Sequence, residues 1–184
     1  MLVSIFVFII VMVISVGAIL SILDANRKTQ TIQLVMDNVD FALEGMARTL
    51  RTGMTYHCNF NFDNPGHRLY EPRDCATGAN SIVFEEAHGS LADETDNYVY
   101  QLNTTTHQIE RATHTNGSNF APITASNVEI SNLMFYVLNT ESATDGIQPR
   151  VIITLRGKAG GASVRKGTEF NLQTIVSQRL PDIP

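Results

Sequence analysis

The stretch MLVSIFVFIIVMVISVGAILSIL, residues 1–23, decides how this chain is organised. It contains no ionisable side chain and is apolar all round, whereas a buried core helix is usually apolar along one stripe. An α-helix rises about 1.5 Å per residue, so these residues extend over about 30–35 Å, enough to cross a bilayer. A secretory signal would show a cationic start and a small-residue cleavage site, and this stretch has neither. We therefore predict a membrane-spanning helix with core residues Ile5, Ile9, Val13, Val16 and Ile19.

The helical pattern continues through DANRKTQTIQLVMDNVDFALEGMARTLRTG, residues 24–53, without a proline. Gly53 is the first strong terminator, and Arg48 and Arg51 in the last turns complement the helix dipole. Apolar residues recur at alternating spacings of four and three, which places them within an arc of about 80° on one side of a helix. We predict one helix of about 50 residues. The stripe expected to pack on a sheet is Ile32, Met36, Val39, Leu43, Met46 and Leu50.

Leu34 and Phe41 lie on the side of this helix opposite the stripe. They are either a second apolar patch for another subunit or ordinary exposed residues, since isolated apolar side chains are common on protein surfaces.

Beyond Gly53, short segments rich in β-branched and aromatic residues alternate with turn residues. NTTTH, between two such segments, is typical of a hairpin loop, and short connections of this kind favour antiparallel pairing. The helix stripe needs a surface to cover, and a sheet face is the natural one. We predict an α+β fold made of a membrane half-helix (1–23), an amphipathic half-helix (24–53) and a β-rich globular domain (54–184). The predicted strands are 81–85, 98–103, 108–112, 128–138, 150–156 and 169–178.

The chain has two cysteines, Cys58 and Cys75, separated by sixteen residues rich in Asn, Asp, Gly and Pro. A disulfide between them would close a loop worth about 3 kcal/mol on the chain-entropy model, and it would require an oxidising compartment. Two free thiols are the alternative. A zinc site is less favoured because the cysteines do not form close-spaced ligand pairs.

Two features of the sequence predict opposite orientations of the membrane-spanning helix. Arg27 and Lys28 follow the apolar stretch and, by the positive-inside rule, would hold the globular domain in the cytoplasm. A disulfide would instead place this domain outside the cytoplasm. Positive residues upstream of Met1 would remove the conflict.

The composition argues against several classes of function. The net charge is −5 and the basic residues are scattered, whereas nucleic-acid binding requires a concentrated cationic face. No Gly-rich phosphate loop, GxSxG elbow, HExxH or CxxC motif occurs. We therefore expect no enzyme activity, no cofactor and no direct nucleic-acid partner.

Two sets of polar residues could serve as metal ligands. Asp93, Glu94 and Asp96 offer oxygen ligands for calcium, but they lack the regular spacing of a calcium loop, which favours a solvated turn. The histidines are dispersed among polar loop residues, so we expect them at the surface: His57, His67, His88, His107 and His114.

The long apolar stretch that runs without a break into an amphipathic helix, the loop with two cysteines and the closing segment FNLQTIVSQRL resemble a type IV pilin-like protein. The family is that of minor pilins and of minor pseudopilins of type II secretion. The resemblance implies a single-pass protein of the bacterial inner membrane with an extracytoplasmic globular domain. It also implies cleavage by a prepilin peptidase, N-methylation and assembly with other pilin or pseudopilin subunits. Residues 1–23 would then be a membrane anchor first and a filament core afterwards.

The chain departs from the family at its start. Family members carry a short basic leader and then Gly-Phe-Thr-Leu-Ile-Glu, and this sequence begins just after the position of that glutamate. In the family the glutamate pairs with the N-terminal amine of a neighbouring subunit. An upstream start codon that supplies the leader and the glutamate is the explanation we favour, and a variant without them is the alternative.

Two functions from different classes follow. The first is a minor pilin-like or pseudopilin-like structural subunit that assembles through its apolar helix. The second is a membrane-anchored extracytoplasmic binding module that does not enter a filament.

Overall fold

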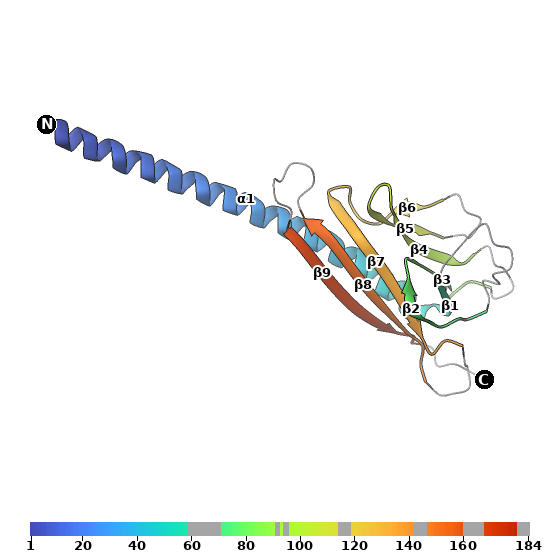
Figure 1. Cartoon of the computed structure of the whole chain (residues 1–184). Coiled ribbons are helices and arrows are strands. Elements are labelled where there is room, and N and C mark those ends of the chain that lie inside the picture. Colours follow the sequence, from blue (N-terminus) through green and yellow to red (C-terminus); the bar gives the residue numbers. More distant parts are fainter. Residues whose placement is uncertain are drawn as a thin grey trace.

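The computed structural model describes residues 1–58, 71–90, 93, 96–113, 119–141, 147–159 and 168–179. In this part of the chain one long helix packs on two antiparallel sheets, so the fold is α+β as predicted. The N-terminal half of the helix projects away from the sheets, and its C-terminal half lies alongside them (Figure 1).

Helix α1 runs from Leu2 to Thr52 without a break, as its proline-free sequence predicts. It ends before Gly53, whose N–H donates a hydrogen bond of 3.3 Å to the Leu50 carbonyl. Gly53 is extended, with φ −74° and ψ 167°, and not in the left-handed conformation usual for a glycine after a helix. A Cβ at this position would collide with the ring of Phe84, so the glycine allows a close approach.

The first sheet has the strand order β1-β3-β4-β5-β6, with all neighbours antiparallel. The hairpin between β4 and β5 is stabilised by Asn103, whose side-chain oxygen accepts hydrogen bonds from the backbone N–H groups of Thr105 and Thr106. The strands are β1 (Met54–Cys58), β3 (Ser81–Glu85), β4 (Tyr98–Asn103), β5 (Gln108–Ala112) and β6 (Ala121–Pro122).

The second sheet has the order β2-β7-β8-β9 and is built on three long strands. Alternate residues of β7 and β8 are buried, but Ile130 and Leu133 both lie inside although they are an odd number of positions apart. A register shift between Ile130 and Asn132 inserts the extra residue that makes this possible. The strands are β2 (Cys75–Ala79), β7 (Val128–Leu138), β8 (Arg150–Ala159) and β9 (Thr168–Ser177).

The strand predictions are largely confirmed. The predicted bounds of β3, β4, β5 and β7 agree with the structure, while β8 extends further, to Ala159, and β9 ends one residue earlier, at Ser177. Strands β1, β2 and β6 were not predicted. The division into two sheets was not predicted either, and it gives α1 a sheet face to cover and a second sheet beside it.

Candidate functional site: the two halves of the long helix

The N-terminal half of α1 is not covered by any other element that the structure describes. Every residue from Met1 to Gln30 is exposed. This half of α1 is long and apolar enough to cross a membrane. The exposed side chains include all the predicted core residues: Ile5, Ile9, Val13, Val16 and Ile19.

Two serine hydroxyls within residues 1–23 are satisfied by the helix itself. The hydroxyl of Ser4 donates to the carbonyl of Met1 at 2.7 Å, and that of Ser15 to the carbonyl of Val11 at 2.8 Å. Backbone groups in a bilayer must be satisfied internally, and an unbroken helix meets this requirement together with these two hydroxyls. Residues 2–23, which carry no ionisable side chain, are therefore chemically suited to an apolar environment.

The second half of α1 is amphipathic and packs into the domain core. Of the predicted stripe, Val39, Met46 and Leu50 are buried. The other three members pack against the core at its margin and are only partly buried: Ile32, Met36 and Leu43. On the far side, Leu34 is 64% exposed and Phe41 is 76% exposed.

Two buried helix residues were missed from the predicted stripe, Val35 at 0% and Ala42 at 3% exposure. At about 100° per residue they shift the centre of the buried face by about 40° from the predicted one. Alanine carries little hydrophobic signal, which is why Ala42 escaped attention, but its small side chain lets the helix backbone come close to its neighbours.

The C-terminal end of α1 is fastened to the domain by hydrogen bonds. The buried Tyr56 hydroxyl on β1 donates to the carbonyls of Leu50 and Gly53, and the N–H of Arg179 donates to the carbonyl of Arg51 at 2.8 Å. The last carbonyls of a helix have no partner within it, and the Arg179 N–H satisfies one of them, that of Arg51. The Tyr56 hydroxyl adds a second donor to the Leu50 carbonyl, which also accepts from the Gly53 N–H. Sequence periodicity cannot reveal such long-range donors.

A polar contact also joins α1 to the first sheet. The hydroxyls of Thr49 and Tyr100 are 2.9 Å apart, and Tyr100 is 1% exposed. Burial raises the pKa of Tyr100, whereas the hydrogen bond with Thr49 and the charge of Arg111 act against this shift. The tyrosine is therefore a neutral hydrogen-bonding group at neutral pH.

Cys58 and Cys75 form a disulfide pair, with Cα atoms 6.0 Å apart. Cys58 ends β1 in the first sheet and Cys75 begins β2 in the second sheet. The link therefore ties the two sheets to one another, and neither the free-thiol nor the zinc alternative describes this arrangement.

A groove of about 320 Å³ lies between α1 and the first sheet. Its lining is mainly apolar and includes Phe41, Met46 and Ile123, with Arg48 and Arg111 also at the groove. Arg48 forms an exposed ion pair with Glu44 at 3.3 Å, while Arg111 lies over the Tyr98 ring, 5.7 Å from its centroid.

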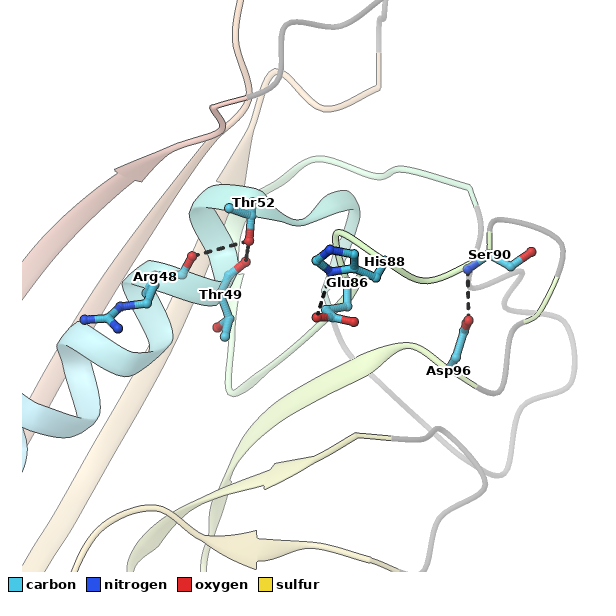
Figure 2. A network of polar contacts seen from close by, with 7 residues as sticks. All are labelled: Arg48, Thr49, Thr52, Glu86, His88, Ser90 and Asp96. Carbon is cyan, nitrogen blue, oxygen red and sulfur yellow. Dashed lines mark hydrogen bonds and ion pairs between the residues drawn. The ribbon is translucent and has the colours of Figure 1, made fainter.

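The acidic residues expected in a solvated turn lie in the connection between β3 and β4. Asp93 is exposed, Asp96 accepts a hydrogen bond from the Ser90 N–H at 2.9 Å (Figure 2), and Glu94 lies outside the described residues. No group of three potential metal-ligating side chains is found among the described residues.

His88 and His107 are exposed, but His57 is only 3% exposed, so its predicted surface location is wrong. His67 and His114 lie outside the described part.

His57 is buried because β1, which was not predicted, pairs it with Val83 of β3 and so makes it a residue of the sheet.

Comparison of the chain with protein-family models, with curated proteins and with solved structures found no match.

Proposed function

We propose that this protein is a structural subunit of the minor pilin or minor pseudopilin kind, which assembles with other subunits through the apolar half of α1. One observation carries the proposal: a single unbroken helix is fully exposed and apolar over its first half and packed on an antiparallel sheet over its second. The two halves form one rod, so neighbouring copies could join through the exposed half without disturbing the packed one.

The free energy of burying apolar side chains favours a bilayer or other subunits around the exposed half of α1. Burying one large aliphatic or aromatic side chain stabilises by about 1.5–3 kcal/mol, so the exposed side chains together represent on the order of tens of kcal/mol. A bilayer covers such a surface before assembly, and the same surfaces of other subunits cover it afterwards. No bond chemistry is involved in this function.

The proposed location is the bacterial inner membrane, with the globular domain outside the cytoplasm and later in a cell-surface or periplasmic filament. The Cys58–Cys75 pair supports the extracytoplasmic side, because disulfides persist in oxidising compartments.

The second candidate is a membrane-anchored binding module, and the groove beside Phe41 favours it. Its apolar lining and the guanidinium of Arg111 would suit a ligand with an apolar part and a negative charge. In this case α1 would act as a tether only.

The experiment compares two matched substitutions in cells of the source organism. Ile9 and Ile175 are 54% and 56% exposed, but Ile9 lies in the apolar half of α1 and Ile175 on β9. A lysine at the centre of a spanning helix costs about 2.5–3.5 kcal/mol, so Ile9→Lys should lower the amount of protein in sheared filaments more than about tenfold. Ile175→Lys should leave this amount near the wild-type level.

Equal incorporation of both variants would contradict the proposal. Wild-type protein that stays in the membrane fraction and is missing from filaments would favour the binding module instead.

A further inference from the structure

Glu85, the last residue of β3, is an acidic side chain buried at 2% exposure. Its Oε1 atom has no hydrogen-bond partner among the described residues. The same oxygen lies against Gly89, in the space that a Cβ at that position would occupy. The turn after β3 is therefore closed directly over a carboxyl group, and a glycine at position 89 is what permits this.

A second carboxyl group, that of Asp96, reaches the same place from just before β4. Asp96 Oδ2 lies 3.3 Å from the point where a Gly89 Cβ would stand, and it accepts the hydrogen bond from the Ser90 N–H (Figure 2). Asp96 Oδ1 is buried and has no hydrogen-bond partner in the described part of the chain. Two carboxyl groups thus converge on one turn, and each has a buried oxygen that is unsatisfied.

The charges that act on Glu85 from the described residues are negative. Asp96 and Asp93 lie in the connection to β4, and Glu86 follows Glu85 and pairs with the exposed His88 at 3.7 Å. On β1 the titratable group is His57, which is paired with Val83, and the end of α1 contributes the uncharged Gly53.

A buried carboxylate and a partly buried one this close cannot both be ionised without a cost, but one shared proton removes the repulsion and supplies a hydrogen bond. We propose that Glu85 and Asp96 form a proton-binding pair that holds the turn of residues 86–90 closed while one proton is shared and loosens it when the proton leaves. The pair is independent of the proposed filament function.

The direction of the pH effect follows from linkage. Burial, followed by the charges of Asp96 and Asp93, raises the pKa of Glu85 to about 7. The unfolded chain loses the Glu85 proton near the ordinary pKa of about 4.5, so between these values the folded state binds more protons. Stability should therefore fall as the pH rises through this window, and it should become level above the folded pKa.

The test measures the thermal midpoint of the full chain in detergent micelles, from about pH 5 to about pH 8.5, for four proteins. They are the wild type, Glu85→Gln, Asp96→Asn and Glu169→Gln. Glu169 is the matched control, because it is exposed and its ion pair with Lys158, at 3.9 Å, lies at the surface. Each titration is repeated with millimolar calcium and with a chelator.

The expected result is a midpoint that falls with pH in the wild type and in Glu169→Gln, but is nearly flat in Glu85→Gln. In Asp96→Asn, where the like charge is gone, the fall should move to lower pH. An equal pH dependence in the wild type, Glu85→Gln and Asp96→Asn would overturn the proposal. It would also be overturned if calcium raised the wild-type midpoint at pH 8 and had no effect on Glu85→Gln, since the occupant would then be a metal ion. If Glu85→Gln fails to fold, the Asp96→Asn shift decides.

Discussion

The two halves of α1 have the same secondary structure and opposite surroundings. In the first half Leu20 is 57% exposed, whereas in the second half Leu50 is 0% exposed. The first half is apolar all round, and the second confines its apolar residues to one face. The comparison shows that the distribution of apolar residues around the helix, more than their number, decides whether this chain can provide its own cover.

The difference also separates two kinds of stability. The packed half contributes to the free energy of unfolding of the domain, because its side chains leave water when the chain folds. The exposed half contributes only when a bilayer or another chain covers it. Substitutions in the two halves should therefore be detected by different measurements.

The largest effect is expected for Leu50→Ala. Truncation of a fully buried leucine leaves a cavity and costs about 2–5 kcal/mol. Chemical unfolding of the purified full chain in detergent, followed by the near-ultraviolet signal of the tyrosines, should show this loss. Leu20→Ala is the matched control and should leave the midpoint unchanged; a similar loss in both variants would mean that the halves are not energetically separate.

The next effect is expected from the disulfide, which lies entirely in the packed region. The double substitution Cys58→Ser with Cys75→Ser should lower the free energy of unfolding by about 3 kcal/mol, since the closed loop no longer restricts the unfolded chain. Reduction of the wild type should reproduce the loss, and the reductant should have no effect on the variant. A wild-type midpoint that does not respond to reductant would refute a stabilising disulfide.

The smallest effect is expected for Tyr100→Phe, which removes the hydroxyl contact between α1 and the first sheet. One intramolecular hydrogen bond contributes about 1 kcal/mol, and Thr49 would lose its partner while keeping the bond to its own helix. Tyr136→Phe, on the half-buried face of β7, is the control for the loss of a phenol. If the two substitutions lower the free energy of unfolding equally, the Thr49–Tyr100 contact does not stabilise the packing of α1 on the first sheet.

The elements that the sequence predicted well have strong local signals. The α1 helix has neither proline nor a break in periodicity, and β3, β4, β5 and β7 are rich in β-branched and aromatic residues. β2, with the sequence CATGA, has little strand propensity of its own and pairs because β7 and the disulfide hold it in place. β6 is two residues long and contains Pro122.

The candidate sites also differ in whether local sequence is enough to predict them. The apolar half of α1 could be predicted from composition alone, because no partner within the chain is needed to define it. The Glu85–Asp96 pair could not, because its two members are brought together by the β3–β4 register and by the close approach at Gly89. Sequence inspection singled out Asp96 and missed Glu85, which looked like one more charge at the end of a strand.

The position of the disulfide has a mechanical consequence. A pull along α1 reaches Gly53 and then the five residues of β1, and at Cys58 it crosses directly to β2 and the second sheet. A subunit of this design would bear an axial load through a short covalent route, so its reduced form should rupture at lower force than its oxidised form.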